Sequence, residues 1–463
     1  MKAMANTWQA HAWALSEFGG ADLGHEARTK RAVRFATALV QNPSASIPRV
    51  VRDAHQAKGA YRLLSNPKVD HDAILTGHIA QTVERCRGKD AILAIQDTTA
   101  LSYTAREGLG PVTNRGKARG FLAHTALAVS FDGGDEVLGV LYQRVWARSD
   151  EKLTQGESCV ARKKRPRESE HWPATQRRIA EHFSQMQGRP RVIAVFDREG
   201  DIFEGFEALD EIGHSFIIRA AWNRLLETDG DDKQYSLDAV KQAPVRAHRT
   251  VRVPGRAGQA ARSAEMEIRA MTAVIRPPRN RGRHGESVSL NIVLALETNR
   301  AADADPLCWY LVTREPIETE RDVLAVMRGY ELRWLIEELH MGIKTGCSAE
   351  ERQLESLGAL ENFLAFATVI AWQMLRLRDA SRRAEPVPAA QILTATQMRV
   401  LRALRPRLKP DCSAAEALRA IATLGGFMGR KSDGNPGWRT LWAGWESLLI
   451  AEAGFLIGKR ESG

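Results

Sequence analysis

The sequence predicts an α/β protein in which a mixed β-sheet is flanked by helical regions at both ends of the chain. Two continuous apolar runs that end in aspartate indicate the sheet, AILAIQD at 91–97 and RVIAVFD at 191–197. Such runs are typical of strands buried on both faces. Helical patterns dominate before residue 72 and after about residue 372, so we expect the sheet to lie between two helical regions.

Length and composition describe a soluble globular protein with a surplus of positive charge. The 463 residues allow two or three domains, and 44% hydrophobic with 26% charged residues is ordinary for a globular chain. The formal net charge is +10, and basic residues gather at 162–167 (RKKRPR) and 276–284 (RPPRNRGRH). These runs suit the phosphates of a nucleic acid, although charge alone equally describes solvated loops.

Cysteine usage and hydropathy predict a cytoplasmic protein without membrane contact. The five cysteines are scattered and form no CxxC pair, which argues against a disulfide framework and against a zinc site. The first residues lack an apolar core of signal-peptide length, and no apolar run approaches the ~20 residues that span a bilayer.

Residues 1–72 are predicted to form a small helical domain. Within it, ARTKRAVRFATALVQ at 27–41 reads as an amphipathic helix whose basic face includes Arg28 and Arg31. GAYRLLSNP at 59–67 predicts a further short helix that Asn-Pro ends. A helical module with one basic face can bind DNA or can cap a neighbouring domain, and the pattern alone leaves both open.

Residues 73–372 are predicted to contain the sheet. Segments 122–132 and 137–147 flank a Gly-Gly turn and indicate a hairpin. Helical segments between the strands predict crossover connections as well, hence a mixed sheet. Residues of about 221–306 break this rhythm with β-like stretches joined by Gly-, Pro- and Arg-rich links, which predicts a β-rich insertion before a buried strand at 308–314.

The segment 328–344, RGYELRWLIEELHMGIK, is predicted to be one helix at the rim of a cleft. In a regular helix an apolar stripe about 60° wide is formed by Leu332, Ile336, Leu339 and Ile343. A second stripe, roughly 110° from the first, is formed by Tyr330, Arg333, Glu337 and Lys344. The helix can therefore pack on one side and present a carboxylate with flanking cations on the other, although such a stripe can also be an ordinary solvated face.

Asp97, Asp197 and Glu337 are expected to meet at one edge of the sheet. A lone aspartate at a strand end is most often a turn or capping residue, but three converging carboxylates favour hard divalent cations. Two Mg²⁺ ions, or Mn²⁺ in their place, about 4 Å apart suit an in-line displacement at a phosphodiester. Asp97 would bridge both ions, and Asp197 and Glu337 would each hold one. Arg333 and Lys344 would bind the neighbouring phosphates.

These residues carry a resemblance to a known family. IQDTT around Asp97 and FDREGDI around Asp197 are similar to motifs of DDE transposases of the bacterial IS-four group, Tn-five type. The spacing Tyr-x2-Arg-x3-Glu-x6-Lys within 330–344 is a signature of that group. Segments at 18–31 and 59–67 resemble its N-terminal DNA-binding module, and 424–448 resembles its C-terminal helical region. The similarity covers nearly the whole chain.

The resemblance implies an RNase H-like catalytic domain at 73–372 between a DNA-binding domain at 1–72 and a dimerisation domain at 373–463. It implies that Asp97, Asp197 and Glu337 form the metal-binding catalytic triad. It also implies DNA contacts for Tyr330, Arg333, Lys344, Arg219, Arg28, Arg31 and Trp309, the last being the position on which the family stacks a flipped base.

Two further positions are noted within the resemblance. Trp334 either walls the flipped-base pocket or packs against the insertion. Met341 stands where close relatives carry lysine, so one phosphate contact is missing or comes from elsewhere. Late in the chain, Trp438, Trp442 and Trp445 follow helical spacing and are expected in the core or at a subunit contact.

The function that the resemblance implies is metal-dependent cut-and-paste transposition. A homodimer in a bacterial, nucleoid-associated setting would bind double-stranded terminal repeats, nick them, form and open hairpins, and join the element to target DNA. Two alternatives stay open: a metal-dependent nuclease without strand transfer, and a non-catalytic DNA-binding regulator. A glycosidase-type pair of carboxylates is disfavoured because it needs no grip on phosphate.

Overall fold

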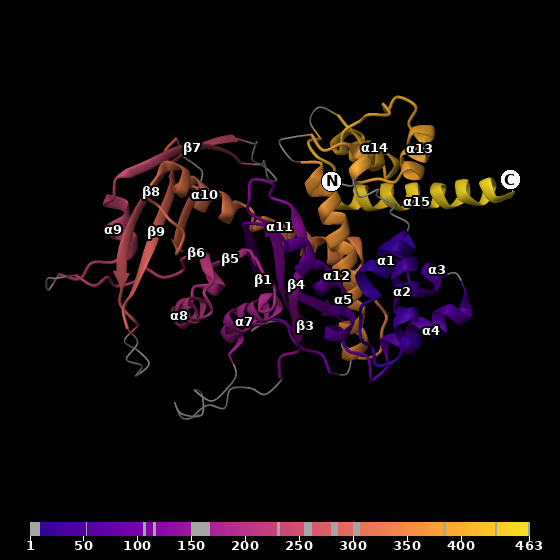
Figure 1. Cartoon of the computed structure of the whole chain (residues 1–463), viewed down its shortest axis with the longest axis horizontal. Helices are drawn as coiled ribbons and strands as arrows, with labels where there is room; N and C mark the ends of the chain where they lie inside the picture. Colours follow the sequence, from indigo (N-terminus) through magenta and orange to yellow (C-terminus); the bar gives the residue numbers. More distant parts are fainter. Residues whose placement is uncertain are drawn as a thin grey trace.

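The computed structural model confirms the predicted fold class, because in chain order a mixed sheet stands between N-terminal and C-terminal helices. Figure 1 shows both sets of helices on the same side of the sheet. Most of the basic runs at 162–167 and 276–284 lies outside the residues that the structure describes. The described residues are 10–51, 53–104, 108–113, 117–149, 167–228, 232–253, 262–278, 286–299, 306–382, 386–430 and 433–461.

The described strands form one ten-stranded sheet in the order β2-β3-β1-β5-β6-β10-β9-β8-β7, with β4 pairing β3. The pairs β1–β5 and β5–β6 are parallel and the other pairs are antiparallel. The strands are β1 (Ala91–Tyr103), β2 (Gly110–Pro111), β3 (Arg119–Ser130), β4 (Val137–Trp146), β5 (Arg191–Phe196), β6 (Ser215–Arg219), β7 (Val245–Val253), β8 (Arg262–Ile275), β9 (Val288–Glu297) and β10 (Cys308–Thr313).

The β-rich insertion extends the sheet. Its strands β7, β8 and β9 form an antiparallel meander, and β9 pairs with β10 along the whole length of β10. Figure 1 shows this meander curving away from the rest of the sheet on the side opposite the N-terminal helices.

Helices cover both faces of the central strands, which explains the continuous apolar runs. On one face, Ile92 and Ala94 of β1 pack with Ile179 of α7 (His171–Phe183). On the other face, Leu93 and Ile95 belong to the core that includes α10 (Glu320–Glu331), α11 (Trp334–Met341) and α12 (Leu357–Ala380). Two further helices among the described residues of the sheet region are α8 (Phe203–Ile212) and α9 (Ser236–Gln242).

The expectation that the first buried strand ends at Asp97 is wrong. Strand β1 continues for six residues beyond Asp97, to Tyr103. Its parallel partner β5 stops at Phe196, but its antiparallel partner β3 pairs with it through the whole extension. A continuous apolar run indicates the part of a strand that is buried on both faces. The run at 91–96 therefore ends where burial on both faces ends, although the strand itself continues.

The N-terminal helices share one hydrophobic core with the sheet and the C-terminal helices. Phe18 of α1 stacks on Phe366 of α12, with ring centroids 5.1 Å apart. Asp53 caps α4, so this helix begins earlier than the predicted 59–67 segment. The elements are α1 (Ala10–Phe18), α2 (Glu26–Gln41), α3 (Ile47–Val51), α4 (Ala54–Leu64) and α5 (His71–Cys86).

A buried ion-pair network joins α1 to α5. Glu17 is 3% exposed; its carboxylate accepts hydrogen bonds from His78 Nδ1 at 2.6 Å and from Arg85 Nη1 at 2.9 Å. The Arg85 guanidinium lies 4.4 Å from the ring centroid of Trp372 on α12. Burial raises the pKa of Glu17, but the hydrogen bonds and charges of His78 and Arg85 outweigh it and lower the pKa from 4.5 to about 2.

We expect Glu17→Gln to lower the free energy of unfolding by about 3 kcal/mol at pH 7, because a pKa depressed by about 2.5 units is lost. This contribution is complete above the unfolded pKa of 4.5 and disappears as the pH falls through 2. Urea titrations at pH 7 and pH 3 should therefore show a gap between wild type and variant that shrinks by more than half. A gap of the same size at both pH values would contradict this origin.

The C-terminal helices are α12, α13 (Ala395–Leu404), α14 (Ala414–Leu424) and α15 (Trp438–Glu461). By length and composition α12 is the one described helix that could cross a bilayer, but 83% of that window is buried inside the protein. The three late tryptophans are 1–6% exposed, which confirms the core expectation. Gly444 lies so close to α14 that a Cβ atom would stand 1.9 Å from the carbonyl oxygen of Ile421, so this crossing requires glycine.

Candidate active site

Strand register brings Asp97 and Asp197 side by side. The parallel ladder pairs Ala91 with Arg191 and ends at Ile95 with Val195. Continued by two residues, this register places Asp97 next to Asp197, which directly follows β5. Asp197 also caps the 3₁₀ turn η2 (Arg198–Gly200) by accepting from the Glu199 N–H at 2.8 Å. Its side chain therefore serves the turn and is held at the strand edge by it.

The segment 328–344 is not the single regular helix that we expected. Helix α10 ends at Glu331, α11 begins at Trp334, and residues Gly342–Gly346 form a π-helical turn. The joint is made by i to i+3 hydrogen bonds, with the Ile336 N–H donating to the Arg333 carbonyl at 3.2 Å. Glycine or proline, the usual sequence markers of a break, is absent from 332–333, so the interruption is set by packing.

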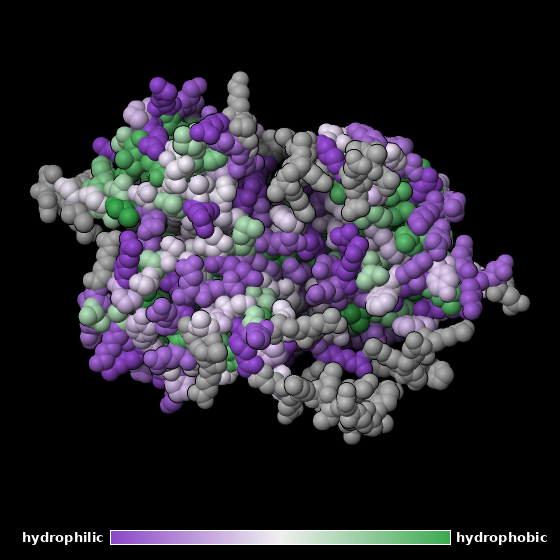
Figure 2. Space-filling view, turned by 180° about the vertical axis from the view of Figure 1, so that it is seen from behind, coloured by the Kyte–Doolittle hydropathy of each residue, from purple (hydrophilic) through white to green (hydrophobic). Residues whose placement is uncertain are grey.

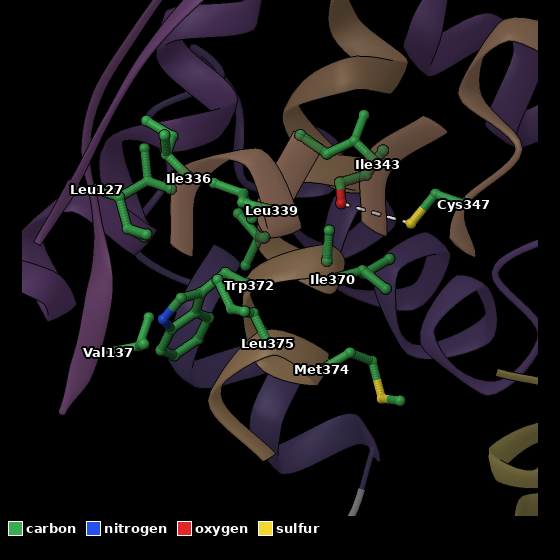
Figure 3. Close-up of a cluster of buried hydrophobic side chains, with 14 of the residues drawn as sticks. Leu127, Val137, Ile336, Leu339, Ile343, Cys347, Ile370, Trp372, Met374 and Leu375 are labelled. Atoms are coloured by element: carbon green, nitrogen blue, oxygen red, sulfur yellow. Dashed lines mark hydrogen bonds between the residues drawn. The ribbon is translucent and has the colours of Figure 1, made fainter. Parts of the chain in front are cut away.

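The apolar stripe of this segment is confirmed. Its four side chains are at most 6% exposed and belong to the main core. Figure 3 shows Leu339 next to Trp372 of α12, and Ile336 next to Leu127 of β3. A hydrogen bond from Cys347 to the Ala367 carbonyl fixes the end of the segment against the same helix. This packing holds the opposite face of α11 toward the sheet edge.

Arg333 lies between two of the three carboxylates. It donates a hydrogen bond to Glu337 through Nη2, and its Nη1 stands 3.9 Å from Oδ2 of Asp97. The side chains of Arg333 and Asp97 are 14% and 16% exposed, whereas that of Glu337 is 32% exposed. The guanidinium thus partly neutralises a group of acids that is only partly open to water.

The pKa of Asp97 responds to the charges of the other two acids. Burial raises its pKa most, the negative charges of Asp197 and Glu337 raise it further, and the result is a pKa of about 7 instead of 3.8. The charge of Arg333 and a hydrogen bond from the Thr98 N–H, 2.9 Å long, act in the opposite direction without restoring the ordinary value. A cation at this position would relieve the repulsion.

The donor chemistry of this group fits a hard divalent cation, but the side chains do not form a ready-made cage. Within the described ranges, no three His, Cys, Asp or Glu side chains lie close enough together to hold a metal ion. The reason is visible in the ion pairs: the Arg333 guanidinium is bonded to Glu337 and adjacent to Asp97. Carboxylates that surround a cationic group are still the ligands that Mg²⁺ prefers.

Asp97 and Glu337 line a cleft of about 560 Å³, whereas Asp197 is not among its lining residues. Seen from behind, the surface is hollowed between the C-terminal helices and the β-rich insertion, and hydrophilic residues line the hollow (Figure 2). Among the lining residues, Lys344 supplies a cation and Trp334 is 51% exposed, so Trp334 is not packed away in the core. Met341, 47% exposed, stands in the same wall and adds no charge.

The other expected DNA-contacting residues fall into two groups. Beside the acids, Trp309 on β10 meets Tyr330 edge to face at 5.5 Å, and Arg219 donates to the Cys308 carbonyl at 3.2 Å. Tyr330 is only 5% exposed and packs between Trp309 and Arg333, so its DNA contact stays a prediction.

The second group lies on α2, in the N-terminal helices and not at the cleft. Arg28 donates to the Leu23 carbonyl at 2.8 Å, so part of its guanidinium serves the fold. Arg31 is exposed and stands beside Gly59 of α4. The structure therefore does not gather these two arginines with the acids.

Sequence reasoning missed three residues that border the acids. His340 is 6% exposed, and its Nδ1 lies 3.9 Å from Oδ2 of Asp97; burial lowers its pKa to about 3 and keeps it neutral. Glu338 and Arg378 line the cleft as an ion pair. The sequence could have indicated His340, because a residue three positions after Glu337 lies next to it on a helix. The sequence could not have indicated that Glu338 pairs with Arg378, which lies 40 residues later in the chain.

Two known protein families match this chain, one in the N-terminal helices and one in the C-terminal helices. The family model described as Transposase DNA-binding matches residues 10–69, which span α1 to α4. The model described as Transposase Tn5 dimerisation domain matches residues 369–461, which run from within α12 to the end of α15. DNA and a second copy of the chain are therefore its partners. The expected recognition is confirmed, and the chain is a transposase of the Tn5 type within the IS-four group.

Proposed function

We propose that this transposase moves an insertion-sequence element by a cut-and-paste pathway, with Asp97, Asp197 and Glu337 as the acids that hold two divalent metal ions. One arrangement carries the proposal: the register of β1 with β5, continued by two residues, places Asp197 next to Asp97, and Asp97 lines one cleft with Glu337. In this arrangement burial and the charges of Asp197 and Glu337 raise the pKa of Asp97. Isolated structural aspartates usually show the opposite shift, because their partners are donors or cations.

The reaction proposed for the site is displacement at a phosphodiester. Bound Mg²⁺, or Mn²⁺ in its place, would activate the attacking oxygen and stabilise the leaving one. A nick at the element end, hairpin formation, hairpin opening and strand transfer are all in-line displacements, so one set of acids serves the four steps. Arg333 and Lys344 then bind the phosphates on either side of the reacting one.

Arg333 has a second task in this proposal. With no DNA bound, Arg333 pairs with Glu337 and lies beside Asp97. Its positive charge reduces the repulsion between these two carboxylates. When a phosphate enters the cleft, the guanidinium is released to the phosphate oxygens, and the carboxylates are freed for cations. Binding of the DNA end and assembly of the metal site would thus be linked through one side chain.

The remaining expected contacts give the DNA its path. The exposed Arg31 on α2 would bind the terminal repeat in the N-terminal domain. Trp309, half buried beside Tyr330, would stack on a flipped base near the cleft, which is the step that a hairpin requires. Pairing of two chains would bring two terminal repeats together before target DNA is attacked.

The test uses DNA that carries the gene with both flanks. Purified protein is incubated with this fragment in Mg²⁺ or in EDTA, beside Glu337→Gln and the exposed control Glu355→Gln, and products are resolved on a denaturing gel. We expect excised element with hairpin ends for wild type and control in Mg²⁺, and none in EDTA or for Glu337→Gln.

Other outcomes identify the alternatives. DNA binding without any cleavage would make the chain a regulator. Nicks without hairpins or joined target would make it a nuclease. Nicks that persist in Glu337→Gln would show that Glu337 is the wrong carboxylate.

A further inference from the structure

The catalytic helix α11 is held by the C-terminal helices through the residue next to Glu337. Glu338 is 7% exposed, and its carboxylate contacts cations at the end of α12. Its two carboxylate oxygens pair with Arg378 at 3.1 Å and with Arg382 at 3.0 Å. One cation near the end of α12 and one just beyond it thus converge on a single buried carboxylate of α11.

The same contact continues into α15. The Arg378 guanidinium lies 4.8 Å from the ring centroid of Trp438. That ring packs on Gly342, where an added Cβ would stand 3.4 Å from it, and stacks on Trp442 at 6.2 Å. Trp442 in turn covers Gly346, where a Cβ would stand 1.8 Å from its Nε1. The π-helical turn after α11 is therefore seated on two tryptophans of the C-terminal helices.

We propose that Arg378 and Glu338 are positioning residues that lock α11 to the dimerisation domain, so that the placement of Glu337 against Asp97 depends on how that domain is docked. Arg378, Arg382 and Trp438 all lie in the range that matches the dimerisation domain, whereas Glu338 and Glu337 do not. The inference rests on the proposed function only for the role of Glu337.

Physical chemistry supports a positioning role over a purely stabilising one. Burying a guanidinium is costly, and burial lowers the pKa of Arg378 to about 10 even though Glu338 opposes the shift. An apolar pair would hold two helices at lower cost, whereas a planar guanidinium between a carboxylate and an indole defines one relative orientation. Small misplacement of a catalytic group is sufficient to slow a reaction strongly.

Hydrogen exchange on the full-length, metal-free protein tests the lock without reference to catalysis. In Arg378→Met, amides of α11 at 334–341 should exchange about 10-fold faster or more, while β1 stays unchanged. Arg378→Lys keeps the charge but loses the planar stack and should fall between wild type and Arg378→Met. Arg399→Met, which removes an arginine 5.2 Å over Phe455 within the C-terminal helices, is the matched control and should leave α11 unchanged.

Nicking of a saturating DNA end then tests the consequence for Glu337. The Mg²⁺ concentration for half-maximal nicking should rise about 10-fold in Arg378→Met. Should Arg378→Met fail to fold, Glu338→Gln, which keeps the size of the side chain, replaces it. Unchanged exchange in α11 for a folded variant overturns the proposal, whereas absence of nicking by wild type overturns the proposed function and leaves the exchange result standing.

Discussion

Asp97→Asn is expected to abolish nicking and, at the same time, to stabilise the metal-free protein. The proposal gives Asp97 the role of a ligand for the metal ions at the reacting phosphodiester, so its loss should slow nicking by at least ~1,000-fold. Binding of the DNA end should remain, because the cations of the cleft are untouched. The measurement is the single-turnover nicking rate of wild type and Asp97→Asn on one labelled end. Residual nicking within ~10-fold of wild type would remove Asp97 from the catalytic set.

The gain in stability follows from the raised pKa of Asp97. A shift from 3.8 to about 7 means that the folded state holds a proton that the unfolded state has lost. Stability therefore falls as the pH rises from about 4 to about 7, by at most about 4 kcal/mol. Urea unfolding in EDTA should show Asp97→Asn more stable than wild type by a margin that grows by about 3 kcal/mol between pH 5 and pH 8. A margin independent of pH would contradict the shared-charge interpretation.

Arg352→Met is expected to cost about 4 kcal/mol in the free energy of unfolding. Arg352 is 4% exposed and donates to the carbonyls of Pro43, Ala45 and Cys347, the last at 2.6 Å. Its guanidinium also lies 4.5 Å from the ring centroid of Phe363. One side chain thus joins the loop after α2 to the segment after the π-helical turn, and no apolar replacement can satisfy those carbonyls.

Urea titration followed by tryptophan fluorescence at pH 7 measures this loss. The matched control is Arg419→Met, because Arg419 is exposed, donates to one carbonyl and lies over Phe427, and it should change stability by less than about 0.5 kcal/mol. Equal losses for the two variants would show that the buried carbonyl contacts of Arg352 contribute nothing.

Several features of the site were accessible from sequence because they depend on local patterns. Asp97 and Asp197 follow runs of the same length and type, and a parallel register then aligns them. The apolar stripe of 332–343 follows from helical spacing and survives the break in the helix. The charged stripe that contains Glu337 also follows from helical spacing, and the family resemblance then assigned it to the same set as the two aspartates.

Other features escaped because they depend on what packs nearby. The continuation of β1 past Asp97 depends on β3, and the joint at 332–333 depends on packing against the core. The burial of Tyr330 depends on Trp309, a residue of another element. Secondary-structure propensity and hydrophobic periodicity describe one segment at a time, so they cannot predict which other elements pack against it.

By itself the sequence determined that this protein is a mixed α/β chain between two helical regions, and to which family it belongs. Only the tertiary structure decided that Arg333 lies between Asp97 and Glu337, and that Glu338 is held by Arg378 from the dimerisation domain. The physical reason is sequence separation. Hydrophobic periodicity depends on residues that are close in the sequence, whereas the partner of a buried charge can lie far away in the sequence and is determined by the tertiary fold.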